Sequence, residues 1–217
     1  MKHRAIWAAL SSLAIATCTT AMEKPEAGWI PLFDGKSLDG WKINESPDSV
    51  TVQDGAIVCK GERAHLFYVG PVASHEFKNF ELKLDAMTTP GANSGVFFHT
   101  RFQETGWPTV GYEAQVNSSH GDWRRTGSLY DVADVRESPS KDNEWFHYHI
   151  MVLGKRIVLK VNGKTTVDYT EPDDLKPPAE KPERRLSRGT FALQVHPPAD
   201  VAVYYKNIMV RPLPDTP

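Results

Sequence analysis

The sequence predicts an all-β fold, a jelly-roll β-sandwich of two antiparallel sheets. Short runs of alternating apolar and polar residues recur from residue 28 onward, separated by Gly, Pro, Asn or Asp. Almost no segment has the 3.6-residue periodicity of a helix. Roughly ten or more strands at regular spacing are typical of a sandwich, and no internal repeat points to a propeller.

The predicted strands follow one another closely along the chain. Residues 49–61 form a hairpin, with two strands around the Asp54-Gly55 turn. The remaining strands are expected within residues 79–89, 94–102, 109–118, 144–170 (three strands), 188–196 and 201–213. The segment 171–185 is rich in proline and charge and cannot be a central strand. We expect a surface loop there, with a rim loop over a binding face as the alternative.

The first 21 residues have the pattern of a secretory signal peptide. The basic "MKHR" precedes the short apolar run "AIWAALSSLAIA" and the small residues "TCTTA". The apolar run is too short for a comfortable transmembrane helix, so we expect no membrane span. Cleavage after Ala21 leaves residues 22–27 as a short linker and 28–214 as a single jelly-roll domain. The protein is thus expected to be exported, either periplasmic or secreted, with a lipoprotein anchored through Cys18 as the alternative.

Composition and motifs exclude several functions. The net charge is −2 and no basic block occurs, which argues against a nucleic-acid partner. The chain contains two cysteines, Cys18 and Cys59, and we expect no disulfide framework and no thiolate metal site. No G-x-S-x-G elbow, H-E-x-x-H motif or P-loop is present.

Two further patterns give weak indications of chemistry. Glu81 and Asp85 flank Lys83 on one predicted strand and lack the arrangement that two-carboxylate glycosidases need. His147 and His149 share a strand face, a geometry that could bind a divalent metal. No third ligand is evident, so we expect surface histidines there and no cofactor.

Three predicted strands each carry polar side chains two residues apart. Because side chains alternate along a strand, the members of each pair share a face. If the strands are neighbours, the pairs form one ligand-binding face. A solvated sheet face is the alternative, with an ordinary ion pair between Glu113 and Arg101. The pairs are His99 and Arg101, Glu113 and Gln115, and Gln194 and His196.

The residue types on this face suit a sugar. A glutamine amide both donates and accepts hydrogen bonds, as sugar hydroxyls require. Trp107, Trp123 and Tyr130 lie nearby in the sequence and could stack on a pyranose ring, although packing would explain each of them as well. Periodicity alone does not separate an enzyme from a binding protein.

Seven segments, in this order, resemble the 3-keto-disaccharide hydrolase domain family, long catalogued as a domain of unknown function. They are "PLFDGKSLDGW" (31–41), "SGVFFHTR" (94–101), "GYEAQV" (111–116), "TGSLYDV" (126–132), "EWFHYHIMVLGKRIVLKVNG" (144–163), "RGTFALQVH" (188–196) and "VYYKNIMVRPL" (203–213). The resemblance covers residues 28–213 and implies a concanavalin A-like jelly roll in an exported bacterial protein. Asn117-Ser118 stands where many members carry an Asp, and Phe146 where Asn is common.

The resemblance implies cleavage of glycosides that are oxidised at C3. The ketone acidifies the C2–H bond, so a base can remove this proton and the group at C1 leaves by β-elimination. Addition of water then makes the net reaction a hydrolysis. Such a site needs a tuned base, a partner for the enolate oxygen and an acid for the leaving group.

Roles for the site residues follow from this chemistry as hypotheses. Glu113 or His196 is the base, because histidine titrates near neutral pH and burial can raise the pKa of a glutamate. Arg101 and His99 stabilise the enolate. Hydroxyl binding is assigned to Gln115, Gln194 and Tyr130, and Tyr130 is also a candidate proton donor. A non-catalytic carbohydrate-binding module using the same face is the alternative function, and an envelope interaction protein without sugar affinity is a third.

Overall fold

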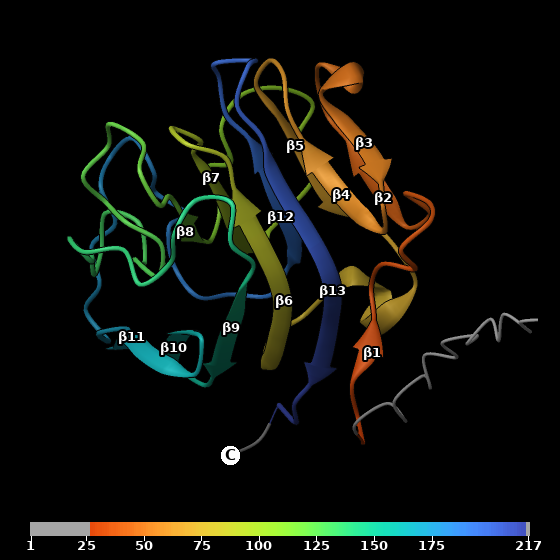
Figure 1. The fold of residues 1–217 in the computed structure, drawn as a ribbon. Helices are drawn as coiled ribbons and strands as arrows, with labels where there is room; N and C mark the ends of the chain where they lie inside the picture. Colours follow the sequence, from red (N-terminus) through yellow and green to blue (C-terminus); the bar gives the residue numbers. More distant parts are fainter. Residues whose placement is uncertain (1–26, 216–217) are drawn as a thin grey trace, which may run out of the picture.

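The computed structural model describes residues 27–215, which form two antiparallel sheets packed face to face (Figure 1). The strands are β1 (Ile30–Pro31), β2 (Trp41–Ile43), β3 (Val50–Gln53), β4 (Ala56–Cys59), β5 (Ala64–Tyr68), β6 (Phe80–Thr88), β7 (Ser94–Thr100), β8 (Tyr112–Val116), β9 (Phe146–Leu153), β10 (Arg156–Val161), β11 (Lys164–Thr170), β12 (Thr190–Val195) and β13 (Val203–Pro212). Two short 3-10 helices, Pro47–Ser49 and Val72–His75, complete the fold.

The larger sheet has the strand order β11-β10-β9-β6-β13-β4-β3, and β1 also pairs with β13. The smaller sheet has the order β2-β5-β12-β7-β8. In Figure 1 the long strand β13 runs between β6 and β4, with the smaller sheet behind it. The prediction of a jelly-roll sandwich with two antiparallel sheets is confirmed.

All the predicted strands form, but the sequence analysis missed β1, β2 and β5. β5 was missed because all five of its side chains are buried, so the segment has no apolar–polar alternation. β1 and β2 are only two and three residues long, too short to show a periodicity. Cys59 is buried at the end of β4.

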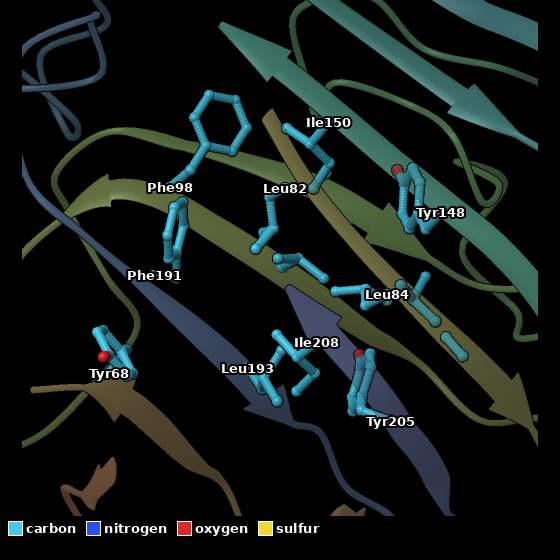
Figure 2. Packing of buried hydrophobic residues seen from close by; sticks show 14 of the residues in the cluster. Tyr68, Leu82, Leu84, Phe98, Tyr148, Ile150, Phe191, Leu193, Tyr205 and Ile208 are labelled. Carbon is cyan, nitrogen blue, oxygen red and sulfur yellow. The ribbon is translucent and has the colours of Figure 1, made fainter. Parts of the chain in front are cut away.

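The core lies between the two sheets. Strand β6 alternates strictly between buried and partly exposed residues, which is the pattern of a sheet with one face covered. Figure 2 shows its inward residues Leu82 and Leu84, with Tyr148 and Ile150 of β9, among side chains of the smaller sheet such as Phe98 and Phe191. Full burial of one such large apolar side chain stabilises the fold by about 1.5–3 kcal/mol.

The predicted signal peptide, including Cys18, and most of the predicted linker lie outside the described residues. In the described range, 27–215, no helix has the length and apolar character needed to cross a membrane.

Candidate active site

The strands that carry the predicted polar face are neighbours, because β7 lies between β12 and β8. In the register of β7 and β8, Phe97 pairs with Glu113 and Gly95 pairs with Gln115. The outer face of the smaller sheet therefore carries Glu113, Gln115 and, from β12, Gln194, as the alternation rule predicted.

A pocket of about 270 Å³ opens over this face. Its walls come from the strands β7, β8 and β12 and from the loops next to these strands. The lining residues are Asn93, Phe97, Trp107, Pro108, Glu113, Gln115, His120, Asp122, Tyr130, Lys181, Gln194 and His196. A volume of this size, with aromatic walls and a few polar groups, suits a small ligand.

Glu113 is the strongly perturbed acid of the pocket. Burial raises its pKa to about 8, while the positive charges of Lys181 and Arg124 oppose the rise and the carboxylate of Asp122 adds to it. Gly95 on the neighbouring strand makes room for this side chain, because a Cβ atom there would collide with the Glu113 carboxylate. A carboxyl group that titrates near neutral pH can act as a proton acceptor.

Amide side chains share the pocket with this carboxyl group. With its nitrogen turned toward Glu113, the buried amide of Gln115 donates to Oε1 of Glu113 at 3.1 Å and to the Ser94 carbonyl at 2.9 Å. The Gln115 amide also lies 3.2 Å from that of Asn93. On β12, Gln194 is buried and lines the same pocket. These amides can bind the hydroxyl groups of a sugar.

One wall of the pocket is aromatic. The rings of Trp107 and His196 lie 5.3 Å apart at an angle of 35°, and His65 packs edge-on against Trp107 at 5.4 Å. His65 is fully buried, and this burial lowers its pKa to about 3, so its ring is neutral. His196 Nδ1 lies 2.6 Å from the carbonyl of Pro197 and therefore donates to it, which leaves Nε2 as the basic nitrogen.

The loop after β8 forms a second wall, of which sequence reasoning found Tyr130 but missed His120 and Asp122. The side chain of buried Asn117 donates to the carbonyls of Asp122 and Arg124 and thereby fixes the loop. This loop brings His120 and Asp122 to the pocket, and the hydroxyl of Tyr130 lies 3.4 Å from Oδ2 of Asp122. Burial raises the pKa of Tyr130, so this hydroxyl keeps its proton at neutral pH. Asn117 thus anchors the loop.

The structure places His99 and Arg101 outside the pocket, contrary to the sequence prediction. His99 adopts a left-handed backbone conformation (φ 54°), which breaks the alternation at the end of β7. The His99 ring is buried, with Nε2 donating to the Lys78 carbonyl at 2.9 Å and Nδ1 accepting from the Ser187 amide at 3.1 Å. Arg101 is exposed and forms a two-pronged ion pair with Glu183. Neither side chain lines the pocket that contains Glu113.

Trp123 also does not line the pocket. It is exposed, and the guanidinium groups of Arg124 and Arg136 lie over its ring at 4.9 and 4.3 Å. The prediction that Trp123 binds substrate therefore receives no support from its position. Trp107, Tyr130, Gln115, Gln194, Glu113 and His196 all line the pocket, as expected.

The two histidines considered for a metal site lie on the outer face of the larger sheet. His147 Nδ1 is 3.0 Å from Asp85, and His149 Nε2 is 3.4 Å from Glu81, both carboxylates on the adjacent strand β6. Within residues 27–215 no group of three or more His, Cys, Asp or Glu side chains has an arrangement that could hold a metal ion. Each histidine is therefore half of a separate cross-strand pair.

Lys181 lines the pocket but was not named as a site residue by the sequence analysis. It belongs to the proline-rich segment 171–185, whose expected place was a surface loop. The alternative considered for this segment, a rim loop over a binding face, matches the structure. Charge and proline content alone do not indicate which lysine reaches a pocket.

The model of the 3-keto-alpha-glucoside-1,2-lyase-like domain family matches residues 28–211. The chain belongs to this family. A curated relative, the 3-keto-disaccharide hydrolase of Bacteroides thetaiotaomicron, is 28% identical over 170 residues, which are 65% of this chain and 58% of the relative. The chain thus spans less than two thirds of that protein.

Solved structures of other proteins have folds similar to that of this chain. A protein of Parabacteroides distasonis, proposed to be a glycosyl hydrolase, has a TM-score of 0.73 at 23% identity, over 86% of this chain and 94% of that chain. The carbohydrate-binding module CBM66 of Bacillus subtilis has a TM-score of 0.54 at 12% identity, over 79% of this chain and 95% of that chain. At these identities the likeness concerns the fold alone.

Proposed function

We propose that this protein cleaves 3-keto-glycosides by β-elimination, with hydration completing a net hydrolysis, and that Glu113 is the base. The observation that carries the proposal is a half-buried carboxyl group that lines a pocket of about 270 Å³ and whose pKa desolvation raises to about 8. Membership of the lyase-like family and the name of the curated relative support the same reaction.

The proposed reaction has two steps, loss of the C2 proton and then loss of the group at C1. The Glu113 carboxylate takes the proton from C2, and the C–H electrons form the C2–C3 double bond of an enolate. As the C3 carbonyl re-forms, the C1–C2 double bond forms and the C1–O bond breaks. The leaving oxygen takes up a proton, and Tyr130, protonated at neutral pH, can supply it.

Glu113 suits the role of base better than His196 does. A base acts best when its pKa lies near the working pH, and burial brings Glu113 to that range. His196 packs between the rings of Trp107 and His120 on the aromatic wall. Its position suits stacking against a sugar ring. Gln115, Gln194 and Asn93 are assigned to the hydroxyl groups.

The experiment is an incubation of the purified protein with a 3-keto-disaccharide and, separately, with its unoxidised parent. NMR in deuterated water follows exchange at C2, and mass spectrometry follows cleavage. We expect exchange and cleavage of the keto sugar only. A parallel incubation with EDTA determines whether a divalent metal is needed.

A non-catalytic carbohydrate-binding module is the second candidate, since the amide and aromatic groups of the pocket would serve binding equally well. A binding protein needs no tuned base, so the raised pKa of Glu113 favours the enzyme. Binding of either sugar without exchange or cleavage would establish the binding module instead.

We also propose that the protein is exported through residues 1–21 and is periplasmic or secreted. The basic, apolar and small-residue order of that segment supports export. Mass spectrometry of the native protein would identify its N-terminus. A start at residue 22 is expected, whereas a lipid-modified Cys18 would indicate the lipoprotein.

A further inference from the structure

Lys181 brings a positive charge into the pocket from a loop. It lines the pocket together with Glu113 and Tyr130, is half-buried, and its Nζ lies 5.7 Å from the centre of the Tyr130 ring. In the part of the chain that the structure describes, Lys181 forms no ion pair with a carboxylate. Its charge therefore remains available to a ligand.

The segment that follows Lys181 is held to the sheet by side chains of β7 and its continuation. Arg101 binds the Glu183 carboxylate through two contacts of 2.8 and 2.5 Å. His99 accepts a hydrogen bond from the Ser187 amide. Both residues were predicted to touch substrate, and both instead hold the loop that carries Lys181.

Further contacts fix the same segment. The Gly111 amide donates to the Glu183 carbonyl at 3.1 Å, and Arg184 binds Asp131 at 2.9 Å. The amide of Leu186 donates to the carboxylate of Glu171 at 2.7 Å. A loop with this many partners presents its lysine at a defined position, which lowers the cost of reorganisation when charge develops.

We propose that Lys181 binds the enolate oxygen of the substrate, and that Arg101, through Glu183, is a positioning residue for Lys181. This inference rests on the proposed function, in which removal of the C2 proton puts negative charge on the C3 oxygen. Among the lining residues Lys181 is the only lysine or arginine, so it is the cation that can meet this charge. Lys181 keeps its proton in this step, because the charge on the C3 oxygen is released when the carbonyl re-forms and departs with the leaving oxygen.

The test compares four variants. Lys181→Met keeps the length of the side chain without its charge, and Lys181→Arg restores the charge. Arg101→Gln removes the anchor of Glu183. Arg156→Gln is its matched control, since it removes a similarly exposed two-pronged ion pair with Asp168, on β10 and β11. Circular dichroism and thermal unfolding check that each variant folds.

For the keto sugar we expect Lys181→Met to lower kcat about 100-fold, as loss of one oxyanion partner does, with a small change in KM. Lys181→Arg should recover most of this loss. Arg101→Gln should lower kcat by up to about fivefold, the size of an exposed ion pair. It should also move the acidic limb of the pH–rate profile upward, because a displaced Lys181 no longer opposes the raised pKa of Glu113.

The outcomes separate the two proposals. If the wild-type protein neither exchanges C2 nor cleaves the keto sugar, the proposed function is overturned. If the wild type is active and Lys181→Met turns over at the wild-type rate, only the role of Lys181 is overturned. If Arg101→Gln behaves like Arg156→Gln in both rate and pH profile, Arg101 is not a positioning residue.

Discussion

The hydroxyl of Tyr205 in the larger sheet lies 2.6 Å from the hydroxyl of Ser94 in the smaller sheet. Both side chains are fully buried, and Ser94 also donates to the backbone carbonyl of Gln194 at 2.6 Å. This chain of hydrogen bonds links the core of the sandwich to the strand that carries a pocket residue, so the rigidity of the pocket depends on the packing of the two sheets.

Tyr205→Phe removes the inter-sheet hydrogen bond and keeps the ring. We expect a loss of about 1 kcal/mol in the free energy of unfolding, typical of a buried hydrogen bond, with an unchanged dependence on denaturant. Urea unfolding measures this loss. Tyr204→Phe, on the outer face of the same strand, should change stability little; an equal loss there would argue against the inter-sheet link.

The pH–rate profile identifies the base. If Glu113 acts as its carboxylate, kcat/KM for the keto sugar should rise with pH and level off above about 8, because the group is protonated below its raised pKa. His196→Ala should keep this limb, and Glu113→Gln should abolish turnover. If His196→Ala removes the limb and Glu113→Gln still turns over, the base is His196 instead.

The free energy of unfolding should fall over the pH range in which kcat/KM rises, because both depend on the ionisation of Glu113. Glutamates of the unfolded chain ionise near the usual value of about 4.3, whereas Glu113 in the folded protein ionises at about 8. Between these values the folded state holds a proton that the unfolded state has lost, so wild-type stability falls as pH rises.

Glu113→Gln removes this loss, and its stability advantage should grow from pH 5 to pH 8 and then stay constant. Urea unfolding at several pH values would measure it. The control is Glu62→Gln, which neutralises an exposed carboxylate. A pH-independent difference for Glu113→Gln would show that burial does not raise the pKa of this group.

Gly95→Ala tests the space beside the base. The new Cβ would collide with the Glu113 carboxylate and displace it, and a misplacement of about 1 Å can cost about 100-fold in rate. We expect the rate to fall by that order. Gly121→Ala, in open space on the loop after β8, should leave the rate unchanged.

Substitutions of two similarly exposed tryptophans test whether the substrate stacks on Trp107. Trp107 is 39% exposed and lines the pocket, whereas Trp123 is 41% exposed and lies outside it. Trp107→Ala should raise KM about tenfold, which corresponds to ~1.4 kcal/mol of lost binding. Trp123→Ala should leave KM unchanged, and a comparable rise in KM would place the substrate over Trp123.

The sequence predicted the fold and the polar strand residues of the pocket because strands obey a simple alternation. Glu113, Gln115 and Gln194 lie inside regular strands, so their shared face followed from their spacing. The same rule failed at His99, because its left-handed backbone conformation breaks the alternation of side chains between the two faces of the sheet. His120, Asp122 and Lys181 come from loops, where no period relates a residue to a direction, and tertiary contacts alone bring them to the pocket.

The position of β13 has a consequence for how the molecule folds. Val203 pairs with Thr88 and Pro212 with Phe80, and the opposite edge of β13 pairs with β4. The two halves of the larger sheet are therefore joined by a strand that is synthesised after all the others. Contacts of such high sequence separation make folding slow, and a nascent chain that lacks β13 leaves the inner edges of β6 and β4 unpaired. We expect the larger sheet to close in one late step, when β13 pairs with both β6 and β4.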